Sequence, residues 1–151
     1  MNFKELANQY KQELFESVLP FWLEKSQDKE CGGYFTCLER DGEVFDTDKF
    51  IWLQGRQVWM FSMLYNNVEK RQEWLDCALL GGEFLKKYGH DGNYNWYFAL
   101  NREGKPLVEP YNIFSYTFAT MAFGQLSIAT GNEKYAKIAK NTFDIILSKV
   151  D

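Results

Sequence analysis

Two long stretches of this chain are apolar enough to be buried on all sides, and they alternate with stretches that carry charge on one side. Residues 50–68 contain a single charged side chain, Arg56, and residues 110–132 contain none. A helix that is apolar all round is covered by other elements, whereas an amphipathic helix keeps one face in water. The alternation therefore predicts an inner layer of helices covered by an outer layer.

Five helices are predicted from apolar residues at helical spacing. The second and fourth are the apolar ones, and the first, third and fifth are amphipathic: residues 3–25, 50–67, 70–88, 113–130 and 133–149. The apolar side chains of the amphipathic helices, Phe143 and Leu147 of the fifth among them, are expected to face inward.

Helix ends are predicted from capping residues and from proline. Pro20 should kink or restart the first helix near its end. Gly89 and Gly131 should end the third and fourth helices. Asp46 and Asp48 are expected to cap the second helix rather than to act as acids.

A β-hairpin is predicted before each apolar helix, around the turns Arg40-Asp41-Gly42 and Arg102-Glu103-Gly104. The second turn repeats the first at a fixed offset in the numbering, and Gly33-Tyr34 recurs as Asn93-Tyr94. Each repeat unit is a hairpin, an apolar helix and an amphipathic helix. The predicted fold class is all-α, an α/α toroid with short β-hairpins between helices.

Two such units do not close a ring, because the second and fourth helices would each leave an apolar flank uncovered. We therefore expect residues 1–151 to be a single incomplete domain, the N-terminal portion of a longer barrel. The alternative is that oligomerisation, for instance as a homodimer, covers the flank.

Charge and cysteine content exclude several classes of partner. The net charge is −4 with scattered lysines, so no nucleic-acid footprint and no attraction to an anionic membrane surface is expected. The three cysteines and the single histidine, His90, match no zinc spacing, and no metal or other cofactor is predicted. His90 is expected to be a turn residue. The charged N-terminus lacks an apolar signal core, which together with the odd cysteine count favours a reduced, cytoplasmic chain.

Arg56 is the most informative single residue, because a guanidinium stays ionised and is unfavourable to bury alone. Either another part of the protein pairs with it, or a cavity and its ligand do. Trp52 and Trp59 stand at i−4 and i+3 from it, so all three share a helix face. These rings could stack on a sugar or pack in the core, since 18% of the chain is aromatic.

Tyr111, Asn112 and Ser115 lie at the start of the fourth helix. If the two inner helices run parallel, their N-termini and the hairpins share one rim, and polar groups there can reach a ligand. These three residues are therefore candidates for substrate binding.

A family resemblance is carried by residues 32–61, GGYFTCLERDGEVFDTDKFIWLQGRQVWMF. They resemble the N-acylglucosamine 2-epimerase (renin-binding protein) family. Residues 113–126, IFSYTFATMAFGQL, are similar to the next inner helix of that family, with Tyr116 where an acidic residue is common. The resemblance implies an (α/α)6 barrel and an isomerase that interconverts N-acylglucosamine and N-acylmannosamine, or epimerises related sugars at C2.

The resemblance also implies a mechanism. A base removes the proton α to the carbonyl of an open-chain sugar, and an acid returns it to the other face. Arg56 matches the barrel-lining arginine of the family and would stabilise the enolate oxygen. The catalytic histidines of the family belong to the later half of the barrel, so these 151 residues alone are predicted to be inactive.

Three other interpretations remain open from the sequence. Cellobiose or mannose 2-epimerases share the fold expectation, and so do (α/α)6 glycoside hydrolases, which need two carboxylates across a cleft. Neither apolar helix contains an acidic residue. A helical-repeat scaffold that binds proteins is disfavoured, because a hairpin precedes each inner helix and the repeat is far longer than a simple helix pair.

Overall fold

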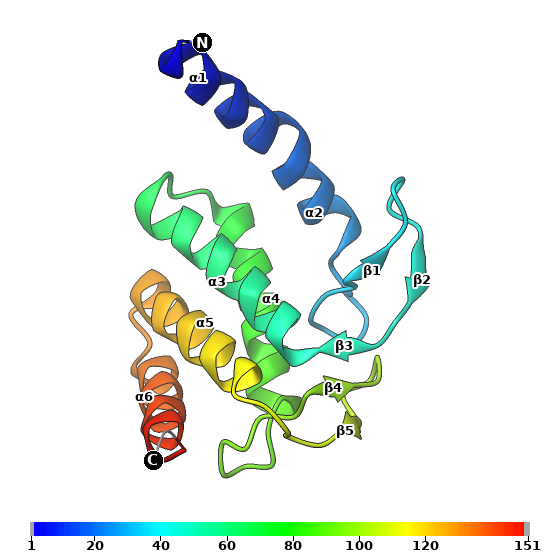
Figure 1. Cartoon of the computed structure of the whole chain (residues 1–151), viewed down its shortest axis with the longest axis vertical. Helices are drawn as coiled ribbons and strands as arrows, with labels where there is room; N and C mark the ends of the chain where they lie inside the picture. Colours follow the sequence, from blue (N-terminus) through cyan, green and yellow to red (C-terminus); the bar gives the residue numbers. More distant parts are fainter. Residues whose placement is uncertain (1, 150–151) are drawn as a thin grey trace.

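The computed structural model describes residues 2–149 as a set of helices with two small sheets (Figure 1). The helical segments are α1 (Phe3–Glu13), the π-helical turn η1 (Leu14–Val18), α2 (Leu19–Lys25), α3 (Ile51–Asn67), α4 (Gln72–Tyr88), α5 (Phe114–Thr130) and α6 (Glu133–Ser148). The strands are β1 (Cys37–Leu38), β2 (Val44–Asp46), β3 (Lys49–Phe50), β4 (Ala99–Leu100) and β5 (Pro106–Val108).

The two apolar helices, α3 and α5, lie side by side and run in the same direction (Figure 1). Helix α4 packs against α3, and α6 packs against α5. The core between them is formed by fully buried side chains of both layers: Ile51, Val58, Phe61, Trp74, Cys77, Leu85, Ala119, Phe123 and Leu126. The prediction of an inner and an outer helix layer is confirmed.

Gly55 allows the two inner helices to approach each other. A Cβ atom at this position would lie 3.0 Å from the backbone carbonyl carbon and oxygen of Phe118 on α5. Backbone atoms cannot move aside as the end of a flexible side chain can, so a larger residue must push the helices apart.

Gly55→Ala is expected to lower the free energy of unfolding by up to about 2 kcal/mol, because overpacking a core costs about 1–3 kcal/mol and the better helix propensity of alanine offsets ~1 kcal/mol of that. Gly124→Ala on α5 is the matched control, because a Cβ atom there meets nothing within 4 Å. Denaturant unfolding should show the control to be stabilised, and shifts of the same sign in both variants would contradict the packing argument.

The hairpins gather at the N-terminal ends of the inner helices. Strands β1 and β2 pair antiparallel, as predicted. Strand β3, which the sequence did not indicate, pairs with β4, so that the sheet order is β3-β4-β5. Phe50, the residue before α3, is opposite Ala99 in this sheet. The second hairpin is thereby attached directly to the start of the first inner helix.

The internal repeat holds in three dimensions, with one change of alignment. Isolated bridges join Gln27 to Tyr34 and His90 to Trp96. Tyr34 therefore corresponds to Trp96, at the same offset as the two hairpin turns, and not to Tyr94. Each aromatic side chain attaches its segment to the outer helix of its own repeat unit. The Tyr34 hydroxyl donates to the Cys77 carbonyl on α4, and the Trp96 indole donates to Thr142 on α6.

The helix predicted over residues 3–25 is interrupted by the π-helical turn η1, directly before Pro20. A proline clashes with the carbonyl four residues earlier, and a widened turn relieves that clash. No residue of α1 is buried, and Phe3 is 85% exposed. The expectation that the apolar face of this helix points into the molecule is therefore wrong within residues 2–149, where α1 projects past the other helices (Figure 1).

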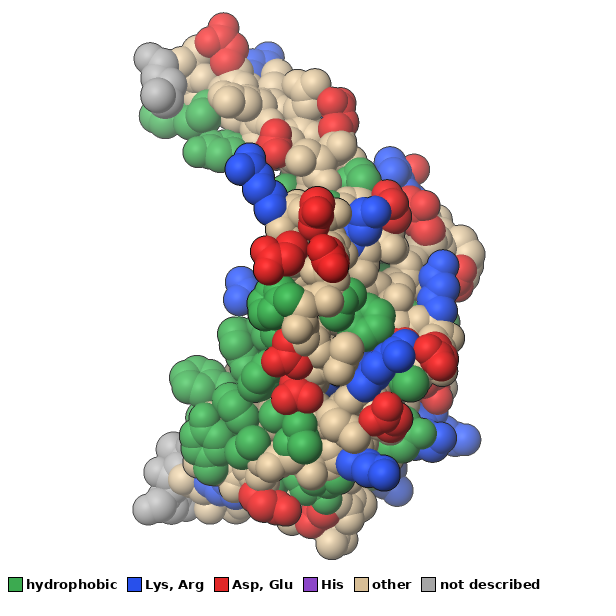
Figure 2. All heavy atoms as spheres, turned by 90° about the vertical axis from the view of Figure 1, so that its right-hand side faces the viewer, with side chains coloured by type: hydrophobic (Ala, Val, Ile, Leu, Met, Phe, Trp, Pro, Cys, Tyr) green, Lys and Arg blue, Asp and Glu red, His purple; other side chains and the backbone are tan. Residues whose placement is uncertain are grey.

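The open flank predicted for the inner layer is present. Phe114, Met121 and Ile128 of α5 are spaced by seven residues and are all exposed, so they form one apolar stripe along the helix. Phe143 and Leu147 of α6 are exposed as well, contrary to prediction, because no described element lies on that side. Figure 2 shows hydrophobic side chains gathered along one edge of the lower half, with acidic and basic side chains interspersed elsewhere.

The caps are only partly as predicted. Gly89 and Gly131 do end α4 and α5, and Gly131 has a left-handed backbone. The cap position of α3 is Phe50, without a side-chain hydrogen bond. Asp46 instead closes a local turn, accepting from the Asp48 N–H at 2.8 Å, because β3 separates both aspartates from the helix. Among residues 2–149, none of the helices has the length and apolarity needed to cross a membrane.

Candidate functional site

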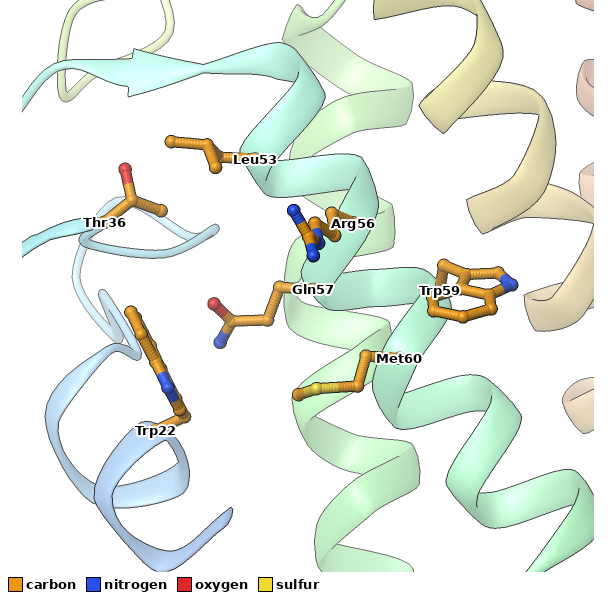
Figure 3. A pocket seen from close by; sticks show the side chains of 7 residues that line it. All are labelled: Trp22, Thr36, Leu53, Arg56, Gln57, Trp59 and Met60. Carbon is orange, nitrogen blue, oxygen red and sulfur yellow. The ribbon is translucent and has the colours of Figure 1, made fainter. Parts of the chain in front are cut away.

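Arg56 lines an open cavity of about 400 Å³ between α2, the first hairpin and α3 (Figure 3). The side chain is exposed and forms no ion pair or hydrogen bond within residues 2–149. Of the two explanations for this charge, pairing inside the protein or a cavity, the described chain therefore offers the cavity. The other lining side chains are Trp22, Thr36, Leu53, Gln57, Trp59 and Met60.

The polar residues on both sides of Arg56 hold the wall of this cavity in place. Gln54 is fully buried, accepts from the Tyr34 N–H at 2.8 Å and donates to the Tyr34 carbonyl at 2.8 Å. Its side-chain amide thus pairs with both the N–H and the carbonyl of Tyr34, as a neighbouring β-strand would. The segment that follows Tyr34 and leads to Thr36 is thereby positioned relative to α3.

Gln57 makes the second attachment. Its amide donates to the Ser26 hydroxyl at 2.6 Å, and that hydroxyl donates in turn to the Trp22 carbonyl. Gln57 and Ser26 are both buried, so water does not compete for these hydrogen bonds. This chain of bonds attaches the end of α2, and with it the Trp22 ring, to the helix that carries Arg56.

The two tryptophans expected beside Arg56 have different surroundings. Trp59 lines the cavity together with Arg56. Trp52 packs against Phe118 of α5, with ring centroids 6.1 Å apart, and is half-buried. Trp22 also lines this cavity but was not predicted from the sequence. The only local feature that could have indicated it is an aromatic residue near the end of a helix.

Tyr111 and Asn112 line a second cavity, of about 240 Å³, at the start of α5, and Ser115 lies in the first turn of that helix. Tyr111 is exposed and packs on Phe98, with centroids 4.7 Å apart. Asn112 accepts from the Phe114 N–H at 3.0 Å, and Ser115 is buried. These residues share the hairpin rim with the N-terminus of α3, but Tyr111 and Asn112 line a different cavity from that of Arg56, and Ser115 lines neither.

A buried ionic cluster, which sequence reasoning missed, connects both hairpins to α3. The Lys49 ammonium donates to Asp28 at 2.9 Å, to the Gly32 carbonyl and to the Arg102 carbonyl. The Arg102 guanidinium donates to both carboxylate oxygens of Asp28. Lys49 and Asp28 are 0% and 1% exposed. The sequence feature that could have indicated this cluster is Lys49, the last residue of the motif Asp46-Thr47-Asp48-Lys49.

The carboxylate of this cluster is held in its ionised form. Burial by itself would raise the pKa of Asp28, but hydrogen bonds from Arg102, the Cys31 N–H and Lys49 outweigh it and bring that pKa well below its usual range. Burial lowers the pKa of Lys49, against the attraction of Asp28. The cluster anchors the rim on which α3 begins.

The sequence model of a family described as N-acylglucosamine 2-epimerase (GlcNAc 2-epimerase) matches residues 33–151. The chain belongs to this family. It is 45% identical over 139 residues to the N-acylglucosamine 2-epimerase of Bos taurus and 44% identical over 136 residues to that of Homo sapiens. These alignments cover 89% and 87% of this chain but 33% and 32% of the relatives. The chain thus spans about a third of the length of the curated family members it matches.

A solved structure supports the same assignment. The cellobiose 2-epimerase of Bacillus thermoamylovorans superposes with a TM-score of 0.85 at 28% identity, over 95% of this chain and 37% of that one. The prediction of an all-α chain that forms part of an (α/α)6 barrel is confirmed. Within this family fold, α3 and α5 are inner helices and Arg56 lies on an inner helix beside the hairpin rim.

The single histidine, predicted as a turn residue, is half-buried after α4, where an isolated bridge pairs it with Trp96. His90 accepts from the Gly92 N–H at 3.0 Å, stacks on Tyr94 and contacts Trp96 edge-on. Burial lowers its pKa, against a smaller opposing effect of Asp91. In the described part of the chain, no group of three or more His, Cys, Asp or Glu residues is placed to hold a metal ion.

Proposed function

We propose that this chain is the N-terminal portion of a sugar C2 epimerase and that it supplies the arginine of the active site. The observation that carries the proposal is Arg56, a guanidinium that has no ion pair within residues 2–149 and faces a cavity with aromatic walls, on an inner helix of this family. Aromatic rings with a few polar groups suit the mixed surface of a sugar.

The chemistry proposed for Arg56 is electrostatic. When the proton next to the carbonyl of the open-chain sugar leaves, negative charge develops on the carbonyl oxygen. The guanidinium donates to that oxygen and stabilises the enolate. The proton itself is removed and returned by general base and acid groups, proposed to be histidines in the part of the protein beyond residue 151.

The proposed substrate pair is N-acylglucosamine and N-acylmannosamine. Support comes from the relatives of that name, which are 44–46% identical, whereas cellobiose 2-epimerases match at 28–33%. A glycoside hydrolase is less well supported, because neither α3 nor α5 carries the acidic residue that such enzymes need.

The test is an epimerisation assay of the full-length protein against N-acetylmannosamine, N-acetylglucosamine, mannose, glucose and cellobiose, run beside the shorter chain of residues 1–151. Exchange of the C2 proton with solvent deuterium is followed by NMR. We expect exchange with the two N-acetyl sugars by the full-length protein and none by the shorter chain. Exchange with cellobiose alone would show that cellobiose, and not the N-acyl sugars, is the substrate. Exchange with none of the sugars would contradict the proposed epimerase function.

Three finer proposals accompany this function. Residues 1–151 are proposed to be one incomplete domain, supported by the exposed stripe on α5. A cytoplasmic location is proposed, supported by three cysteines that form no disulfide in the described chain. The third proposal is that the full-length protein is a homodimer, which is tested by measuring its mass in analytical ultracentrifugation.

A further inference from the structure

Ser26, the C-terminal cap residue of α2, joins three walls of the 400 Å³ cavity. Its side chain is fully buried. The hydroxyl donates to the Trp22 carbonyl on α2 and accepts from the Gln57 amide on α3 at 2.6 Å. Its backbone carbonyl accepts from the Phe35 N–H at 2.6 Å, directly before Thr36. One buried residue therefore connects α2, the segment that leads into the first hairpin, and α3.

Trp22 forms the wall of this cavity that lies opposite α3. Figure 3 shows its ring across the cavity from α3, with the Gln57 side chain extending from the helix toward it. A ring and a guanidinium on two different elements can hold a sugar between them only if the two elements keep a fixed separation. The hydrogen bonds through Ser26 fix that separation.

The second repeat unit is built without this link. Ala119 follows Gln57 at the offset that separates the two hairpin turns. The cap residue of α4 is Gly89, where α2 has Ser26. Neither Ala119 nor Gly89 has a polar side chain, so the architecture of a repeat unit does not require the link. It is present in the unit whose inner helix carries Arg56.

Stability does not explain the link either. A buried polar pair gives little net stabilisation, because both groups give up hydrogen bonds to water, and apolar replacement of both partners is often nearly neutral. Hydrogen bonds do impose a distance and a direction, which apolar contacts do not. The Gln57–Ser26 pair is therefore suited to fixing a geometry.

We propose that Ser26 and Gln57 are positioning residues for the Trp22 ring. They hold it at a fixed distance from α3, where it stacks on the sugar that Arg56 binds. The inference rests on the proposed epimerase function. Because Arg56 is carried by α3 itself, loss of the link moves only the opposite wall. Binding of the sugar is weakened, and the chemical step is not slowed.

The test is steady-state kinetics of the full-length protein with N-acetylmannosamine. Gln57→Leu and Ser26→Ala should each raise KM about two- to tenfold, the size of one aromatic contact. The kcat should stay within about twofold of the wild-type value, because the interactions of the transition state with Arg56 are kept. The double variant should raise KM no more than the larger single effect, since the two residues act as one unit.

A second set of variants shows whether the link acts through the ring. Trp22→Leu should raise KM by a similar factor, and adding Gln57→Leu to it should raise KM no further. A further rise would show that Gln57 acts on the sugar without Trp22 and would overturn the positioning role.

Unfolding in denaturant separates this role from general damage to the fold. The double variant Gln57→Leu/Ser26→Ala replaces both partners by apolar groups, so it should unfold close to the wild type. Asn66→Leu is the matched control on α3, because it removes an amide that donates to the backbone and side chain of Gln125 on α5. It should lower the free energy of unfolding and leave KM unchanged.

Two results overturn the inference in distinguishable ways. If the wild type epimerises N-acetylmannosamine and KM is unchanged in Gln57→Leu and Ser26→Ala, the positioning role alone is wrong. If the wild type epimerises none of the sugars tested, the proposed function and the positioning role fail together.

Discussion

Replacing Arg56 by lysine in the full-length protein is expected to lower the turnover of epimerisation by about 10²–10³-fold, the usual loss when one preorganised donor to a developing oxyanion is removed. Lysine keeps the charge but loses the planar fork of the guanidinium. Arg56 is exposed and unpaired in the described chain, so the variant should unfold as wild type does. Steady-state kinetics and thermal unfolding measure the two quantities.

Arg40→Lys, on the exposed turn of the first hairpin, is the control for a general effect of arginine replacement and should retain wild-type turnover. If Arg56→Lys also turned over as wild type with an intact fold, Arg56 would have no catalytic role. A clear loss of stability in Arg56→Lys would instead indicate a structural arginine, paired with a carboxylate of a neighbouring helix.

Lys49→Met is expected to lower the free energy of unfolding by about 1–3 kcal/mol, because the substitution removes one of the two cations that contact the buried carboxylate of Asp28 at 2.9 Å and leaves the Gly32 and Arg102 carbonyls without that donor. Methionine keeps an apolar stem beside Phe84, over whose ring the ammonium lies at 4.5 Å, so that the change isolates the charge. Equilibrium unfolding in denaturant measures the loss. A shift below about 1 kcal/mol, as for a surface ion pair, would contradict a buried cluster.

The double variant Lys49→Met/Asp28→Asn tests the origin of that loss. In Lys49→Met the buried carboxylate of Asp28 keeps Arg102 as its one cation. Removing both charges takes away this partly compensated ion, and Arg102 keeps Glu30 as a partner at 2.7 Å. We expect the double variant to be more stable than Lys49→Met alone. If it were less stable, lost packing rather than a stranded charge would explain the single variant.

The same cluster predicts a pH dependence. The pKa of Asp28 is lower in the folded chain than its reference value of 3.8, so its stabilising contribution is complete above about pH 4 and is lost as the pH falls further. Acid unfolding of the wild type should therefore steepen below about pH 4. The double variant, which lacks this carboxylate, should show a shallower slope over the same range.

Much of the fold could be predicted from local sequence pattern. The two apolar stretches became α3 and α5, and the repeated turn sequence became two equivalent units, because the spacing of apolar residues in each helix shows whether it is buried on all sides or on one. The two errors about helix burial have one cause. The apolar faces of α1 and of the end of α6 are exposed. The sequence of a helix shows that one of its faces is apolar, but it does not show which element covers that face.

The site was predicted less completely. The position of Arg56 on an inner helix followed from the sequence, but its cavity depends on Trp22 and Thr36, which lie on α2 and in the first hairpin, well before α3 in the chain. The expected caps Asp46 and Asp48 failed because an unpredicted strand pairing, β3 with β4, occupies the space between them and α3.

The sequence by itself determined which helices are inner and which are outer, where the turns fall, and that one arginine lies in an apolar helix. Only the tertiary structure decided what surrounds that arginine and what holds the rim. Lys49 is bonded to groups 21, 17 and 53 residues away, and Arg102 to a carboxylate 74 residues away. Such contacts depend on the distance between elements after packing, and no periodicity in the chain records that distance.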